Sequence, residues 1–94
     1  MDVKTGTIRS YSGEYESGWV IPDVARADLK HLLFSRHGAC KPVRGTDGLG
    51  MDFADLDRFP KEGDHVVYVE TDRPRYSVAS QWCFAEDWEE ASRA

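Results

Sequence analysis

The sequence predicts an all-β protein with a single domain, and three observations support this prediction. Five short segments alternate between apolar and polar residues or are rich in β-branched and aromatic residues, as strands are. Turn signals that contain glycine or proline separate several of these segments. A chain of 94 residues supports one hydrophobic core, so we expect the strands to share it.

The first two expected strands form a hairpin. The first runs from Lys4 to Tyr11 with period-two alternation, and SGE (12–14) supplies the turn. The second, Ser17 to Ile21, ends at Pro22, because proline cannot donate a hydrogen bond to a strand ladder. A loop that contains Asp23 to Asp28 follows.

The third expected strand is Leu32 to Ser35. The segment from Gly38 to Phe59 contains several glycines, and we expect a long loop there. Within it, Asp52 is placed to cap a short helix, in which Phe53 and Leu56 would share a face because they are three residues apart.

The last two expected strands lie in the C-terminal half. The turn signal from Pro60 to Asp64 opens the fourth strand, His65 to Glu70, which is dense in β-branched and aromatic residues. A second turn, Asp72 to Arg75, precedes the fifth strand, Tyr76 to Phe84.

Five short strands with a long excursion between the third and fourth predict a five-stranded Greek-key barrel of the OB type, a fold that binds oligonucleotides or oligosaccharides. An SH3-like barrel is the alternative that the pattern leaves open. The barrel would span residues 1–85, with Phe34 and Tyr68 in its core, and the acidic tail 86–94 would form a short helix or a frayed end.

The charge is unevenly distributed along the chain. The net charge of −5 argues against a protein that holds nucleic acid by charge alone. Residues 1–46 hold seven Lys/Arg against five Asp/Glu, a net of +2, whereas residues 47–94 hold five against twelve, a net of −7. A face for a polyanion would therefore lie on the N-terminal half.

Several other classes of function are disfavoured. Apolar leader and membrane-spanning segments are lacking, so we expect a cytoplasmic protein with no membrane contact, in which Cys40 and Cys83 are free thiols. The spacing of His31, His37 and Cys40 fits no tight zinc pattern, and the acidic segment 47–57 fits no calcium loop. With no catalytic or phosphate-loop motif, we expect no cofactor, no metal and no enzyme activity.

Three segments are similar to one known family: GTIRSYS (6–12), GWVIPD (18–23) and EGDHVVYV (62–69). They resemble the cold-shock domain, which begins Gly-Thr-Val-Lys-Trp-Phe-Asn and continues after a short turn with Lys-Gly-Phe-Gly-Phe-Ile. The resemblance covers most of the chain, from Lys4 to about Phe84. It implies a barrel that binds single-stranded RNA or DNA in a regulatory or RNA-chaperone role, with bases stacked on aromatic residues of strands two and three.

The resemblance also implies which residues bind nucleic acid. Tyr11 and Trp19 keep aromatic positions of the family, and Arg9 keeps the charge of its strand-one lysine. On the third strand, Leu33 replaces a phenylalanine, which removes a stacking ring. Arg36 replaces another aromatic residue with a guanidinium, which stacks on bases and contacts phosphate.

Two further residues complete the candidate nucleic-acid-binding set. Tyr15 is a candidate additional ring, and Arg75 is a candidate rim contact in the turn before the fifth strand. Glu16, by contrast, brings negative charge toward the same face. Each exposed ring that stacks on a base would contribute about 1–3 kcal/mol of affinity.

The orientation of the rings decides between two functions. Trp19 shares the less apolar side of its strand with Ser17 and Ile21, which favours an outward ring that stacks on a base. Burial of Trp19, Leu33 and Tyr11 under the long loop or tail is the alternative. In that case the barrel would be a protein-interaction module, with a protein partner bound through the acidic C-terminal half.

Overall fold

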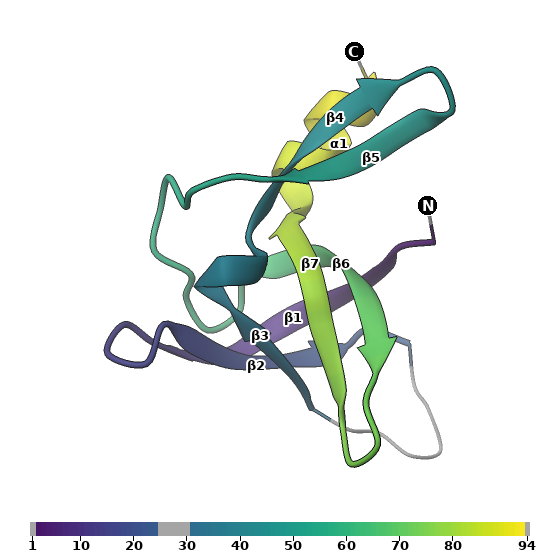
Figure 1. Ribbon diagram of the computed structural model, residues 1–94. Helices are drawn as coiled ribbons and strands as arrows, with labels where there is room; N and C mark the ends of the chain where they lie inside the picture. Colours follow the sequence, from purple (N-terminus) through teal and green to yellow (C-terminus); the bar gives the residue numbers. More distant parts are fainter. Residues whose placement is uncertain (1, 25–30, 94) are drawn as a thin grey trace.

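The computed structural model describes residues 2–24 and 31–93 (Figure 1). Five strands form a closed barrel in the order β1-β2-β3-β7-β6. Their bounds are β1 (Lys4–Ser12), β2 (Ser17–Pro22), β3 (Leu32–Ser35), β6 (His65–Asp72) and β7 (Ser77–Phe84). All neighbours pair antiparallel except β3 and β7, which are parallel. The predicted five-stranded OB-type barrel is therefore confirmed; the predicted loop after Pro22 extends outside the described residues.

One apolar core fills the barrel because inward and outward residues alternate along each strand. Its largest members are aromatic: the ring of Phe34 meets the ring of Trp82 edge-on at a centroid distance of 5.1 Å. The indole Nε1 of Trp82 donates a hydrogen bond to the carbonyl oxygen of Ser35 at 2.8 Å, so its one polar group is satisfied. Phe34 and Tyr68 lie in this core, as the sequence predicted.

The segment between β3 and β6 is more regular than the sequence predicted. It begins with a short 3₁₀ helix, η1 (Arg36–Gly38), and continues as a hairpin of β4 (Cys40–Gly45) and β5 (Gly48–Phe53). The predicted long loop is therefore wrong here. The short helix capped by Asp52 is also wrong, because Asp52 lies within β5. The hairpin closes at Gly48, whose φ of +109° is a conformation that only glycine adopts without steric penalty.

The C-terminal tail forms the helix α1 (Ala85–Arg93), which follows β7 directly and lies beside the β4–β5 hairpin (Figure 1). Arg44 of β4 donates from Nη2 to the carbonyl oxygen of Ala91 at 2.7 Å, which satisfies one of the free carbonyls at the helix end. Trp88 packs on a second apolar cluster, made of Met51, Val67 and Cys83. We call the hairpin and α1 together the end layer, since this cluster joins them to one side of the barrel.

The second cluster also holds both thiols of the protein. Cys40 and Cys83 are free cysteines. Burial raises the pKa of Cys83 to about 12, and burial raises the pKa of Cys40 as well. Both thiols are therefore protonated at neutral pH. Within residues 2–24 and 31–93, no helix is long and apolar enough to cross a bilayer.

Candidate nucleic-acid interface

Trp19 lies on the outer surface of the barrel with 44% of its residue surface exposed. In β2 its neighbours Gly18 and Val20 are buried, so Trp19 faces outward, as the alternation predicted. The pairing register places Ser10 of β1 on one side of Trp19 and Leu33 of β3 on the other. Val78 of β7 lies next to Leu33. We call Ser10, Trp19, Leu33 and Val78 the tryptophan row.

A row of hydroxyl groups runs parallel to the tryptophan row. Ser12, Ser17 and Ser35 lie side by side on β1, β2 and β3, and we call them the serine row. Residues two apart on a strand are separated by about 6.7 Å, so the two rows are adjacent. The side chain of Ser35 makes no capping hydrogen bond to η1, although Ser35 occupies the cap position. Its hydroxyl is thus available to a ligand.

The strand ends beyond the serine row carry charge. Glu16 forms an ion pair with Arg36 at 3.6 Å, and Nε2 of His37 lies 3.9 Å from the Glu16 carboxylate. The amide of Arg36 also donates to the carbonyl oxygen of Glu16 at 2.8 Å, which holds Glu16 at the unusual φ of +55°. Because both side chains of the Glu16–Arg36 pair are substantially exposed, the pair is weak and Arg36 stays accessible.

The strands around Trp19 contain no carboxylate. In a chain with 17 acidic residues, β1, β2, β3 and β7 hold none, and these four strands adjoin one another in the barrel. Arg9 adds positive charge: it is the extra residue of a bulge in β1 and is exposed. This part of the surface is therefore neutral to basic, unlike the protein as a whole.

The bulge at Arg9 explains why Tyr11 does not join Trp19. Without a bulge, Tyr11 would lie on the side opposite to the buried Ile8. The extra residue reverses the alternation, so Tyr11 pairs with the buried Gly18 and points inward. Its ring stacks on Phe34 at a centroid distance of 5.6 Å and meets Phe59 edge-on at 5.1 Å. Of the two orientations that the sequence left open for Tyr11, the structure thus has the one in which the ring is partly buried against the core.

Burial raises the pKa of the Tyr11 hydroxyl, and the nearby Glu16 carboxylate raises it further, while the Arg36 guanidinium lowers it. The Tyr11 hydroxyl thus lies between apolar core residues and the charged side chains of Glu16 and Arg36.

The remaining predicted site residues lie around the tryptophan row. Leu33 belongs to it and is partly exposed. Tyr15 is 76% exposed in the turn between β1 and β2, where its amide donates to the Ser12 hydroxyl. Arg75 is exposed in the turn before β7. Because β3 and β7 run parallel, Arg75 and Arg36, which follows β3, lie at opposite ends of the face.

Among the exposed rings that sequence reasoning missed is Phe53. It ends β5 with 65% of its surface exposed and lines an open hollow of about 590 Å³ together with Arg36 and His37. The alternation of Leu49, Met51 and Phe53 was the signal for a strand, and the glycines between them obscured it. We call this the Phe53 hollow.

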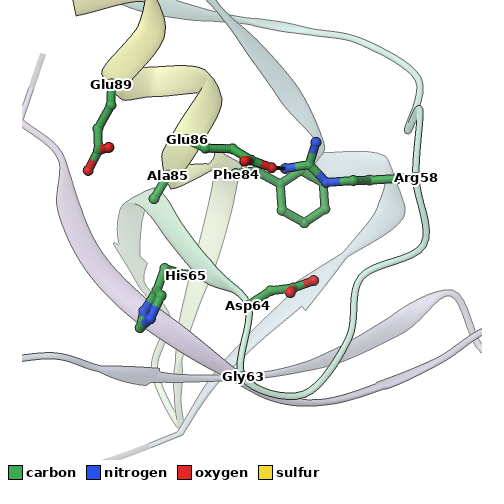
Figure 2. A pocket seen from close by; sticks show the side chains of 8 residues that line it. All are labelled: Arg58, Gly63, Asp64, His65, Phe84, Ala85, Glu86 and Glu89. Carbon is green, nitrogen blue, oxygen red and sulfur yellow. Dashed lines mark ion pairs between the residues drawn. The ribbon is translucent and has the colours of Figure 1, made fainter.

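A different hollow, of about 370 Å³, lies between α1 and the segment before β6 (Figure 2). Arg58 crosses it, with its guanidinium 3.8 Å from the centroid of the Phe84 ring and an ion pair to Glu86. Glu86, Glu89 and Asp64 line this hollow, so its charge does not suit a polyanion. The described residues contain no group of His, Cys, Asp and Glu suited to hold a metal ion.

The residues and strands described above define a small OB-like β-barrel with one exposed aromatic face. The chain matches no protein-family model, no curated protein and no solved structure. The similarity of residues 6–23 to the cold-shock domain therefore rests on the sequence alone.

Proposed function

We propose that the protein is a binding module, rather than an enzyme, for single-stranded RNA or DNA with little sequence preference. The observation that carries this proposal is the exposed Trp19 at the centre of four adjoining strands that hold no carboxylate. Every base has a π-face, so an exposed indole binds single strands whatever their sequence, with about 1–3 kcal/mol per stacked base.

Each part of the face has a role in this proposal. Trp19 stacks on a base, and Leu33 offers an apolar contact beside it. The serine row donates hydrogen bonds to the sugar or to base edges. Arg9 and Arg36 bind phosphates, with Arg75 as a contact at the other end of the face. The OB-type barrel and the similarity to the cold-shock domain favour a regulatory or RNA-chaperone role.

The affinity should be weak and moderately dependent on salt. Tyr11 is turned inward, and Glu16 competes with phosphate for Arg36, so the face offers fewer contacts than the resemblance implied. Two to three phosphate contacts to a single strand would give a slope of about −1.4 to −2 in a plot of log K against log salt concentration.

A protein-interaction module is the second candidate. The observation that favours it is α1, which exposes Glu86, Glu89 and Glu90 to solvent and would suit a basic partner. If the protein does not bind single strands, the protein-interaction module becomes the favoured function.

Fluorescence anisotropy of labelled single-stranded RNA and DNA, at two salt concentrations, tests the proposal. Replacing Trp19 with alanine should weaken binding at least about fivefold, equivalent to about 1 kcal/mol. Trp19→Phe keeps a ring and serves as the matched control, with affinity close to that of the wild type. Absence of binding at low salt, or equal affinities of Trp19→Ala and the wild type, would refute the proposal.

A further inference from the structure

The Phe53 hollow offers an aromatic ring outside the barrel. Phe53 is 65% exposed, more than Trp19 at 44%, although a phenylalanine gains stability from burial. It lies at the base of the β4–β5 hairpin, opposite Cys40 in the strand pairing. The ring is thus presented to solvent by a paired strand rather than by an irregular loop.

The position of Phe53 is fixed relative to the barrel. The amide of Ala54, the next residue, donates to the carbonyl oxygen of Ala39 at 3.0 Å. Ala39 in turn forms a parallel bridge with Trp82 of the barrel strand β7. The first contact closes the base of the hairpin and the second joins that base to the barrel, which makes Phe53 a preorganised surface.

The Phe53 hollow is continuous with the proposed nucleic-acid face. Ser35 of the serine row is followed directly by Arg36 and His37, and these two residues line the hollow beside Phe53. A path over the surface thus leads from Trp19 along the serine row to the side chains of Arg36 and His37, and then to the ring of Phe53. The Arg36 guanidinium thus lies between two exposed rings, as a phosphate lies between two bases of a nucleic-acid strand.

We propose that Phe53 is a second base-stacking platform, and that the ligand is an oligonucleotide that runs from Trp19 across Arg36 and His37 to Phe53. This inference rests on the proposed function and adds the ligand's length and direction. A strand too short to span the two rings binds at one of them, whereas a longer strand binds at both. Asp55 and Glu16 also line the hollow. The phosphate lies on the side of Arg36 and His37, away from Asp55, and competes there with the Glu16 carboxylate for Arg36.

A length series tests the inference. Anisotropy or calorimetry with single-stranded RNA from two to about ten nucleotides covers the site sizes of OB folds. Wild-type affinity should rise until the strand covers both rings. Phe53→Ala should remove this gain and weaken binding of the longest strand at least about fivefold. Phe53→Tyr should keep the gain in affinity with strand length, whereas Phe53→Leu, which keeps apolar volume without a ring, should lose it.

Tyr76→Ala is the matched control, because Tyr76 is another exposed aromatic residue, at 51%, in the turn before β7 and thus at the opposite end of the face. Its affinity for the longest strand should equal that of the wild type. The inference would be overturned, while the proposed function stands, if Phe53→Ala bound the longest strand as tightly as the wild type. A loss of affinity in Tyr76→Ala but not in Phe53→Ala would also overturn it. Failure of the wild type to bind any strand, or no effect of Trp19→Ala, would instead refute the proposed function.

Discussion

The barrel face around Trp19 and the end layer both meet solvent, but they do so with opposite chemistry. Outward positions of β1, β2 and β3 are mainly serine, threonine and apolar residues, without a carboxylate. The helix α1 carries four acidic residues in nine positions and one basic residue, Arg93. Because 31% of the chain is charged, a neutral face with an exposed tryptophan is a departure from the rest of the surface.

This difference indicates where a polyanion can approach. The acidic residues of α1 would repel phosphates from the end layer, while the strands around Trp19 contribute no repulsion of their own. The acidic charge of α1 is thus separated from the surface that we propose for binding. Glu16 is the exception, since its carboxylate lies at the border of the face.

The largest expected effect on nucleic-acid binding comes from a carboxylate in the tryptophan row, which removes the difference in charge between this face and the end layer. Leu33→Glu places a negative charge beside Trp19. If a bound phosphate lies about 6 Å from it, the repulsion is about 0.7–3 kcal/mol and should weaken binding of single strands roughly tenfold. Leu33→Gln, with nearly the same shape, is the control and should bind within about twofold of the wild type. Equal losses in both variants, measured by anisotropy, would show that shape rather than charge matters there.

The two regions also differ in how well the sequence predicted them. The barrel strands were found because one side of each strand is buried and therefore apolar, as in the alternation of Gly18 and Val20 with Trp19. The hairpin was missed because Gly45, Gly48 and Gly50 interrupt its pattern. The hairpin packs on α1 and on the barrel, and no local pattern reveals these contacts.

The site was only partly predictable for a similar reason. The exposure of Trp19 follows from alternation alone. The inward turn of Tyr11 does not, because a single bulge at Arg9 reverses every later residue of β1, and the sequence carries no mark of it. The proximity of Phe53 to Arg36 likewise depends on the hairpin's contacts with the barrel.

A second, smaller effect tests how firmly the end layer covers the barrel. Cys83 lies beneath it, and burial raises the pKa of this thiol to about 12 in the folded protein. An unfolded chain loses the proton near its ordinary pKa of about 8.5–9. The unfolded state therefore binds fewer protons above that pH, and stability should fall as the pH rises from about 9 toward 12.

Between pH 8 and pH 10 the free energy of unfolding should decrease by about 1.4 kcal/mol from this thiol. Guanidinium chloride unfolding of the reduced protein at both pH values measures the decrease, and Cys83→Val, which cannot titrate, should show a smaller one. The same decrease in both proteins would mean that Cys83 is solvated in the folded state, so that the end layer opens readily from the barrel.

The smallest expected effect on nucleic-acid binding comes from removing the Glu16 carboxylate at the border of the face, which increases the difference in charge between the two regions. Glu16→Gln releases Arg36 from its ion pair and removes the carboxylate beside His37, so both side chains become fully available to phosphate. Because these side chains are exposed and screened by salt, single strands should bind only about two- to threefold more tightly at low salt, with the gain fading as salt increases. Glu14→Gln, an equal charge change in the same turn, should give a smaller gain. If both variants improve binding equally, the gain comes from net charge, and Arg36 has no specific part in holding the strand.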